Sequence, residues 1–429
     1  MKRSYHIEDS EGKRIERVEE LTRVLSRNGQ ALVPLLELVA DCRGAVDEII
    51  DVAGRAAIQA VLELSAQEAT GEALRQPGKK RAGEVLRWGR QAGRVSLSDR
   101  KLRVAKPRLR SRSGEEVAVP VYEAMQRDER LGERMLEILL SGVSTRRYEG
   151  VISKMADTAG VSKSSVSRET IEASGKALEE LLERRFEEQD LIIVYVDGLR
   201  FGEQTVIAAV GVDRAGCKHV LGLQHGATEN AAAAQDLLVS LVERGLSPDK
   251  KRLFVIDGSK ALRAAIRKVF GAAPVQRCRA HKLRNVLERL PEQQRQQAQA
   301  AVRAAWKLDA KQGLAQLAKL AEWYERDWPA AAAALREGAE ECFTINRLGV
   351  PPSLWRCLAT TNIIESPNAG VRLRTGRITN WQDADMVQRW VAASLLDAEK
   401  SFRKIMGYRD LWMLDAILNP AASTQQEAA

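Results

Sequence analysis

Two segments of the sequence share one pattern, an apolar run rich in β-branched residues that ends in Asp-Gly. The first run covers residues 191–196 and ends at Asp197, and the second covers residues 253–256 and ends at Asp257. Runs of this kind are typical of strands that are buried on both faces of a sheet. A single unit of this type is more often only a turn. Two units in one chain favour a rigid sheet that presents both carboxylates at one edge, where they can act as metal ligands.

The segments around these strands predict a mixed α/β sheet. Residues 205–212 and 217–223 have the composition of strands, and the turn between them would join them as an antiparallel hairpin. Residues 230–244 and 261–269 have the apolar spacing of helices. The order of three strands, a helix, a strand and a helix allows the two Asp-bearing strands to lie side by side under covering helices.

Positive charge is concentrated in one block near the N-terminus. Although the formal net charge of the chain is only +9, the stretch from Arg75 to Arg112 contains 14 Lys/Arg and two acidic residues. Such an excess of one sign favours contact with a polyanion, first of all nucleic acid, over a merely solvated charged face. We predict a helical region over residues 1–74 and a basic β-meander over residues 75–125. The candidate DNA contacts in the meander are Arg103, Arg108 and Arg110.

The next region, residues 126–188, has the pattern of a helix-turn-helix. Residues 151–159 are helical in character, Gly160 interrupts them, and a second helix can start with Ser162 as its cap. In a helix-turn-helix the second helix enters the major groove, whereas an αα-corner, the alternative, has no role in DNA binding. A long charged helix over residues 171–186 then leads into the core. The residues expected to face DNA are Ser162, Lys163, Ser164, Ser165, Ser167 and Arg168.

Strand signals disappear after the first part of the α/β core, residues 189–282. Residues 283–358 are rich in Ala and Gln and predict an all-helical insertion, with its aromatic residues packed in a core rather than stacked on bases. The core resumes over residues 359–415, where a polar Thr-Thr-Asn start places Glu365 in the first turns of a helix. Residues 416–429 are expected to be disordered. The candidate DNA contacts on the basic surface after Glu365 are Arg372 and Arg374.

Length and composition narrow the class of protein. The chain has 429 residues, of which 45% are hydrophobic, and can bury the cores of several domains. No apolar run approaches the roughly 20 residues needed to span a bilayer, and the polar N-terminus lacks the apolar core of a signal peptide. The five cysteines are scattered and suggest no disulfide framework. We therefore expect a cytoplasmic protein with no membrane partner.

Four motifs in fixed order make the chain resemble the Mutator-type transposases of bacterial insertion sequences. These transposases belong to the DDE superfamily, whose core is ribonuclease-H-like. The resemblance runs from the basic block to about Leu414, and each motif is weak by itself, whereas the ordered set is specific. The motifs are the Asp-Gly pair at Asp197, Val-Ile-Asp-Gly at residues 255–258, Gln-Arg-Cys-Arg-Ala-His at residues 276–281 and Thr-Asn-Ile-Ile-Glu-Ser at residues 361–366.

The resemblance implies a ribonuclease-H-like α/β core in which Asp197, Asp257 and Glu365 are the three acidic catalytic residues. It also implies that the helix-turn-helix region helps to bind terminal inverted repeats and that the core then cleaves and joins DNA. Three neighbouring carboxylates repel one another unless a cation neutralises them, and hard oxygen ligands select Mg²⁺ or Mn²⁺. Two such ions, roughly 3.5–4 Å apart, can activate a water or a 3′-hydroxyl and stabilise the leaving oxygen.

Cys278 and His281 match the Cys-x-x-His motif typical of that family. We expect His281 to contact the scissile phosphate and Cys278 to pack beneath it, since a structural zinc site needs four ligands and no second Cys/His pair has suitable spacing. Two alternatives stay open: a helix-turn-helix regulator whose core no longer catalyses, and a nuclease that cleaves without joining. The expected partners are double-stranded DNA and further copies of the chain, because two element ends must be brought together.

Overall fold

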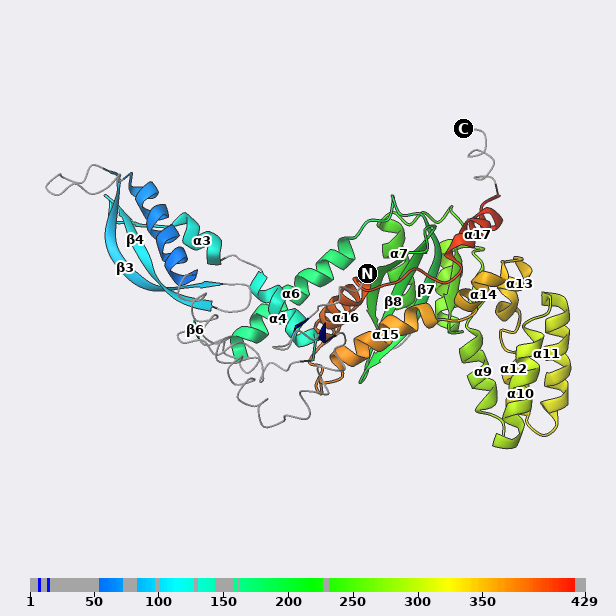
Figure 1. The fold of residues 1–429 in the computed structure, drawn as a ribbon. Helices are drawn as coiled ribbons and strands as arrows, with labels where there is room; N and C mark the ends of the chain where they lie inside the picture. The colour runs from blue at the N-terminus through cyan, green and yellow to red at the C-terminus, as the bar shows by residue number, and fades with distance from the viewer. Residues whose placement is uncertain are drawn as a thin grey trace, which may run out of the picture. The chain divides into compact units, whose positions relative to one another are not determined.

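The computed structural model divides the chain into two compact units, one of residues 1–134 with 146–166 and the other of residues 135–145 with 167–429 (Figure 1). The secondary structure is mixed α/β. No helix in the part of the chain that the structure describes combines the length and hydrophobicity of a membrane span. The described residues are 7–8, 14–15, 54–71, 83–96, 101–126, 130–142, 158–159, 163–226 and 231–420.

The first unit is built on two long antiparallel strands, β3 (Val85–Ser96) and β4 (Lys101–Ser111). The short strand β5 (Glu116–Val117) extends the pair, so the predicted succession of antiparallel strands is confirmed. The end of that region is helical instead. There α3 (Pro120–Gln126) begins with a proline, whose fixed φ and missing N–H suit the first turn of a helix.

The two strands bury one face against α3 and a helix over residues 54–70. Along β4 the side chains alternate, so that Leu102 and Val104 are buried and Arg103 between them is exposed. The helix is held to the strands by Glu63, whose carboxylate forms ion pairs with Arg87 and Arg90. The opposite face of β4 carries the exposed side chain of Arg103. The core residues of this unit include Leu62, Ala66, Val95, Leu102, Val104, Leu109, Val119 and Tyr122.

Two short strand pairs contradict the helical predictions for the N-terminal half. Strand β1 (Ile7–Glu8) pairs with β2 (Arg14–Ile15) inside the region expected to be helical. Strand β6 (Thr158–Ala159) pairs with β4, so the end of the first helix of the predicted helix-turn-helix is a strand. The edge of β4 beyond β5 offers unpaired backbone groups, which explains this pairing. The remainder of the predicted first helix and Ser162 lie outside the described residues.

The predicted second helix of that motif is not a separate element. It forms the first turns of α6 (Lys163–Glu183), a single helix of 21 residues that also contains most of the long charged helix predicted over residues 171–186. The structure therefore contains a long helix where the sequence pattern suggested a short recognition helix followed by a second one.

A five-stranded sheet with the order β11-β10-β7-β8-β9 forms the centre of the second unit. Strands β7 (Leu191–Phe201), β8 (Gln204–Asp213) and β9 (Lys218–Gly226) are antiparallel neighbours. Strands β10 (Leu253–Ile256) and β11 (Val275–Arg277) run parallel to β7. The predicted hairpin and the predicted proximity of the two Asp-bearing strands are confirmed. Strand β11 was not predicted, because three residues carry too little periodicity.

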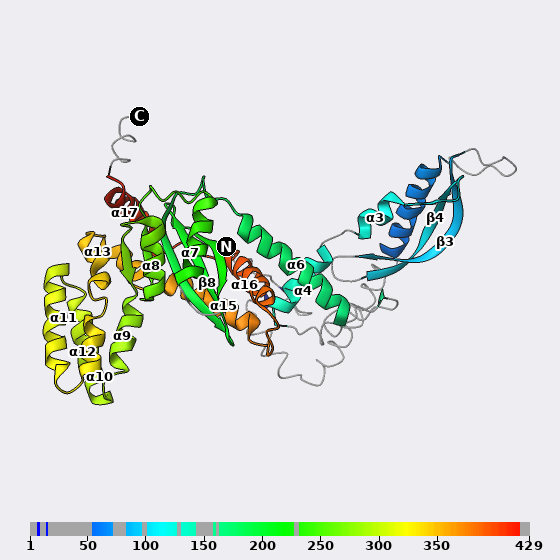
Figure 2. The same ribbon diagram turned by 180° about the vertical axis from the view of Figure 1, so that it is seen from behind.

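Helices cover both faces of this sheet. One face packs on α7 (Ala231–Glu243) and α8 (Lys260–Phe270), which lie in front of the sheet in Figure 2. The other face packs on α15 (Asn362–Thr375), α16 (Ala384–Glu399) and α17 (Leu411–Leu418), together with α6. The prediction of disorder from residue 416 onward is wrong for residues 416–418, which are helical and bury Leu418.

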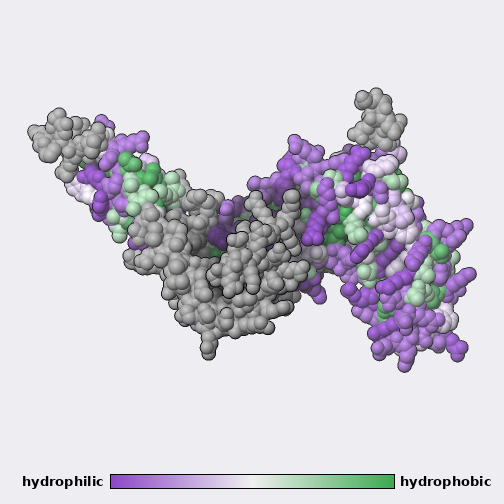
Figure 3. All heavy atoms as spheres, in the orientation of Figure 1, coloured by the Kyte–Doolittle hydropathy of each residue, from purple (hydrophilic) through white to green (hydrophobic). Residues whose placement is uncertain are grey.

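Residues 283–358, all within the described part of the chain, contain helices and no strand, in agreement with the helical pattern of the sequence. The core of this segment contains Val286, Val302, Tyr324 and Phe343, and its exterior is largely hydrophilic in Figure 3. The aromatic residues mostly pack inside as expected, although Trp323 is 53% exposed. The helical segments are α9 (Arg279–Leu287), α10 (Glu292–Ala305), α11 (Ala310–Glu325), α12 (Pro329–Arg336), η1 (Glu340–Phe343), α13 (Thr344–Arg347) and α14 (Pro352–Leu358).

Candidate functional site

The two aspartates come from neighbouring strands in the middle of the sheet, since Asp197 lies within β7 and Asp257 directly follows β10. Strands β7 and β10 pair in parallel, with Tyr195 opposite Val255. Asp197 and Asp257 each come two residues further along the chain, and within β7 a spacing of two places Asp197 on the face that Tyr195 occupies. That face is the one covered by α15. Asp257 is further held by its own loop, since its Oδ1 accepts a hydrogen bond of 2.9 Å from the backbone N–H of Ser259.

Asp197 is the more deeply buried of the two carboxylates and is only 9% exposed. Burial, followed by the negative charge of Asp257, raises the pKa of Asp197 to about 6. Both effects disfavour the charged form and would be relieved by a cation bound between the two carboxylates. The two carboxylates therefore repel each other, as the carboxylate ligands of a metal site do when no metal ion is bound.

Asn368 contacts Asp197 directly and was not predicted as a site residue. Its side-chain Nδ2 donates a hydrogen bond of 2.8 Å to Oδ2 of Asp197, and both residues are buried. This hydrogen bond favours the ionised carboxylate and so opposes the rise in the pKa of Asp197. Asn368 lies one helical turn after Glu365 on α15, so one helix carries the third predicted acid and the residue that orients the first.

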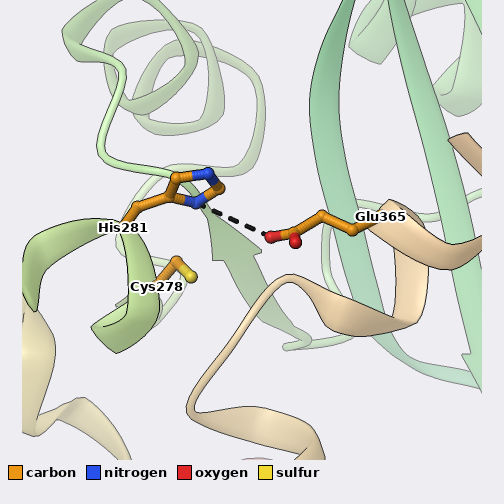
Figure 4. A group of neighbouring side chains, drawn as sticks. All are labelled: Cys278, His281 and Glu365. Carbon is orange, nitrogen blue, oxygen red and sulfur yellow. Dashed lines mark ion pairs between the residues drawn. The ribbon is translucent and has the colours of Figure 1, made fainter. Parts of the chain in front are cut away.

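Glu365 lies in the first turn of α15, as the sequence predicted. Thr361, the residue before this helix, donates a hydrogen bond from Oγ1 to Oε1 of Glu365. The same carboxylate oxygen lies 3.7 Å from Nδ1 of His281. Figure 4 shows the carboxylate extending from α15 toward the imidazole at the start of α9.

Cys278 and His281 meet because of where α9 begins. Cys278 is the residue immediately before the helix and His281 is in its first turn, so the two side chains project from one end of the helix (Figure 4). A hydrogen bond with Cys278 is the main cause that raises the pKa of His281 to about 8. Burial alone would raise the pKa of the Cys278 thiol, but hydrogen bonds from His281 and Thr361 outweigh burial and lower it.

The ligand atoms of Cys278, His281 and Glu365 all lie within 4.8 Å of one another. Within the described residues, this is the group of three ligating side chains that is already assembled, rather than the three carboxylates. The charges of Asp197 and Asp257 are nevertheless close enough to interact with His281. All five predicted core-site residues are thus in one neighbourhood, with the two aspartates on the sheet and Glu365 turned toward the Cys-x-x-His motif.

Arg277 supports the loop that follows Asp257. Gly258 has a φ of +114°, and a side chain there would also overlap the Arg277 guanidinium, so glycine is required on two counts. Arg277 reaches onward and donates from Nη1 to the backbone oxygen of Glu337 over 3.0 Å. At the next residue, Gly338, a side chain would again overlap the guanidinium. Arg277 therefore lies between the loop that follows Asp257 and the helical insertion.

Other residues of the same motif fasten the insertion to the sheet. Gln276 is buried, donates to the backbone oxygen of Cys342 over 3.1 Å and accepts from the N–H of Ile345 over 3.1 Å. Arg279 donates from Nε to the same oxygen of Cys342 over 2.9 Å. Its guanidinium also lies over the ring of Trp306 at 5.5 Å. The Gln-Arg-Cys-Arg-Ala-His segment thus serves both the site and the attachment of the insertion.

The predicted DNA contacts on β4 belong to the basic face of the first unit. Arg103 is exposed. Arg108 lies 3.3 Å from Glu116, and the guanidinium of Arg110 lies 5.2 Å from the ring centre of Trp88, which is itself 56% exposed. This face therefore combines arginines with an exposed aromatic residue.

The remaining predicted contacts belong to two helices. At the start of α6, Ser164, Ser167 and Arg168 are exposed and Ser165 is half-buried, while Lys163 is the first residue of the helix. On α15, Arg372 is exposed. Arg374 instead donates from Nη2 to Oδ2 of Asp397 over 2.7 Å, so its charge is already paired within the second unit.

The fold and the site define an α/β protein with two interacting aspartates on its central sheet and a Cys-His-Glu group beside them, an arrangement that can bind a divalent cation. Comparison with known families identifies the group: the profile described as "Transposase, Mutator family" matches residues 30–404. The chain belongs to the Mutator family of transposases, and the family resemblance drawn from the motifs is confirmed.

Individual relatives agree with this membership. The chain is similar to the protein named "Transposase for insertion sequence element ISRM5" from Rhizobium meliloti (strain 1021), with 30% identity over 371 residues, which is 82% of this chain and 88% of the relative. It is also similar to the "Transposase for insertion sequence element IS256 in transposon Tn4001" from Staphylococcus aureus, with 29% identity over 290 residues, 65% of this chain and 72% of the relative.

Proposed function

We propose that this chain is the transposase of an insertion sequence, that it binds the terminal inverted repeats of its element, and that it cleaves and joins DNA strands with Asp197, Asp257 and Glu365. The second unit would be a ribonuclease-H-like core interrupted by the helical insertion. The names of its relatives support a role in the movement of insertion sequences. Because two element ends must react together, we expect a dimer or larger assembly on DNA.

One observation carries this proposal: Asp197 within β7 and Asp257 directly after the neighbouring strand β10 interact with each other beside the helix that bears Glu365. The mutual repulsion of the aspartates contributes to the raised pKa of Asp197. Active sites are where repulsion of this kind is commonly found. The scaffold is also rigid, since both acids come from buried strands and the third from a helix packed on them.

The side chains fit a divalent cation of the Mg²⁺ or Mn²⁺ type. Asp197, Asp257 and Glu365 would supply carboxylate oxygens, the hard donors that these ions prefer. When bound, the cation activates a water or a 3′-hydroxyl for attack on a phosphodiester and stabilises the leaving oxygen. Asn368 would keep Asp197 ionised and oriented, and His281 would contact the scissile phosphate as a cation, because its raised pKa keeps it protonated at neutral pH.

The DNA end would contact the basic face of β3 and β4 and the exposed start of α6. A two-stranded β-ribbon fits the major groove of B-DNA as an α-helix does. This ribbon presents Arg103 and Arg110 beside exposed Trp88. The strand β6 makes a helix-turn-helix the weaker explanation for DNA binding, although Arg168 on α6 stays available for a phosphate.

The experiment that tests the proposed function uses a labelled duplex carrying the element's own end, with Mg²⁺ or Mn²⁺. Wild type should cleave the end and join it to a target, whereas Asp197→Asn, Asp257→Asn and Glu365→Gln should bind the end and do neither. Asp249→Asn is the matched control, because Asp249 is an exposed aspartate away from the site. Binding without cleavage by wild type would favour the regulator, and cleavage without joining would favour the nuclease.

A second experiment tests the DNA-binding surface. Arg103→Ala and Arg110→Ala should each reduce the slope of log affinity against log salt by about 1, because each arginine would displace one counterion from the duplex. Arg168→Ala tests α6 in the same way. An unchanged slope in both β4 variants, with normal folding, would remove the ribbon from the interface.

A further inference from the structure

We propose that Cys278, His281 and Glu365 form a binding site for a thiophilic divalent ion such as Zn²⁺, and that an ion bound there inhibits the enzyme by withdrawing Glu365 from Asp197 and Asp257. The inhibitory role rests on the proposed function, since it requires Glu365 to serve in catalysis. The existence of the site does not.

The three ligand atoms are nearly in position for tetrahedral coordination. They all lie within 4.8 Å of one another, and Nδ1 of His281 is 3.7 Å from Oε1 of Glu365. In a tetrahedral zinc site with metal–ligand distances of about 2.0–2.3 Å, the ligand atoms are roughly 3.3–3.8 Å apart. Closing the site would therefore shorten the longest of these separations by about 1 Å, a change within the reach of side-chain rotation.

The donor set selects the kind of ion. A thiolate, an imidazole and a carboxylate are the usual protein ligands of Zn²⁺ and Co²⁺, whereas Mg²⁺ binds oxygen and avoids sulfur. Three protein ligands leave a fourth position for water, so the absence of a second Cys/His pair does not exclude such a site. That absence argues only against a closed structural site of four protein ligands.

The surroundings orient two of the three ligands, Cys278 and Glu365, whereas His281 would release its proton when the ion binds. Thr361 donates its backbone N–H to Sγ of Cys278 over 3.4 Å, and its hydroxyl donates to Glu365. The backbone N–H of Cys278 is itself held by the carbonyl of Ile256 at 2.7 Å, so the cysteine is anchored to the strand that carries Asp257. Hydrogen bonds of this kind orient metal ligands and stabilise the thiolate.

The site and the catalytic carboxylates would compete for one side chain. The carboxylate oxygens of Glu365 can coordinate an ion beside Cys278, or they can join Asp197 and Asp257 as the third acid of the catalytic centre. The same oxygen atoms cannot do both at once. An ion held by sulfur and nitrogen would also occupy His281. Zn²⁺ would thus remove both the third acid and the histidine from the reaction while leaving the DNA-binding unit untouched.

The first test is spectroscopic and needs no activity. Titration of the full-length chain with Co²⁺ alone should produce a near-ultraviolet thiolate-to-cobalt charge-transfer band and the strong visible bands of tetrahedral cobalt, saturating at about one equivalent. Cys278→Ser should abolish the charge-transfer band. His281→Asn should weaken cobalt binding by at least about tenfold. The matched control is Cys217→Ser, since Cys217 is a free thiol outside the site. No band in wild type, or a band lost in Cys217→Ser and kept in Cys278→Ser, would overturn the proposal.

The second test concerns inhibition. Zn²⁺ added to a Mg²⁺-supported end-cleavage reaction should inhibit wild type at a concentration at least about tenfold lower than it inhibits Cys278→Ser, each compared with its own zinc-free rate. Equal sensitivity of the two proteins would refute the inhibitory role. A cobalt spectrum without any cleavage by wild type would support the site and count against the proposed function. Cleavage without a cobalt spectrum would do the reverse.

Discussion

Asn368→Ala should lower the activity of the proposed catalytic centre, although it replaces none of the three carboxylates. Asn368 donates a 2.8 Å hydrogen bond to Oδ2 of Asp197 between two buried side chains. A hydrogen bond to a charged group contributes about 1.5–3 kcal/mol. Because the bond favours the ionised form of Asp197, its loss should raise the pKa of that carboxyl, which is already about 6, by a further 1–2 units or so.

The assay is end cleavage measured as a function of Mg²⁺ concentration between about pH 6 and pH 9. In the proposed mechanism activity requires ionised Asp197, so the acid limb of the pH profile should move upward by about 1–2 units in Asn368→Ala. At neutral pH, the same free energy corresponds to a roughly 10- to 150-fold increase in the Mg²⁺ concentration that gives half-maximal activity. Raising the pH should recover much of the lost activity.

The matched control is Asn419→Ala, which removes side-chain amide hydrogen bonds to Lys251 and Asp415 outside the site. It should leave the Mg²⁺ dependence and the pH profile unchanged. If Asn368→Ala kept the wild-type pH limb and Mg²⁺ dependence while unfolding at the wild-type temperature, the role given to Asn368 would be refuted. A second variant, Asn368→Asp, should be more severe, because it places a further negative charge beside Asp197.

Three further outcomes are expected. Chelation of divalent ions should stop end cleavage but leave end binding intact in a gel-shift assay, and binding lost together with cleavage would show that the ion holds the DNA rather than the reaction centre. Gly258→Ala should lower the free energy of unfolding by about 2–4 kcal/mol, because it combines a positive φ with a clash against Arg277. The control Gly349→Ala, at a helix end with a positive φ and open space around it, should cost only about 1 kcal/mol. Equal denaturation midpoints for the two variants would contradict this reasoning. Glu399→Gln should lower the free energy of unfolding by about 1–2 kcal/mol, because it weakens the pairing with Arg184 at 2.9 Å. Urea denaturation at low and high salt measures this change. An unchanged free energy of unfolding at low salt would show that the ion pair does not stabilise the fold.

The parts of the fold that were predicted correctly are those with a strong local pattern. The strands before Asp197 and Asp257 are uniformly apolar, and the polar start before Glu365 marks the first turn of α15. Each of these signals is complete within about ten residues. Their proximity could also be foreseen, because the order of strands and helices leaves few ways to build the sheet.

The errors arose where a distant partner decides the local structure. Thr158–Ala159 has a sequence compatible with a helix, but β4 offers it an unpaired edge more than 50 residues earlier in the chain. The failure to predict Asn368 as a site residue has the same cause. A polar residue inside a helix gives no local sign that it faces a carboxylate 171 residues away.

The contact of Arg277 with two glycines bears on how proteins of this kind could exchange parts. The guanidinium leaves no room for a side chain at Gly258, beside Asp257, or at Gly338, near the end of the helical insertion. The insertion is therefore not a module that can be swapped independently of the core. A chimera that received a foreign insertion with any other residue at that position would displace Arg277 and, through it, the loop that carries Asp257. Recombination between relatives should succeed only when both glycines and the arginine are inherited together.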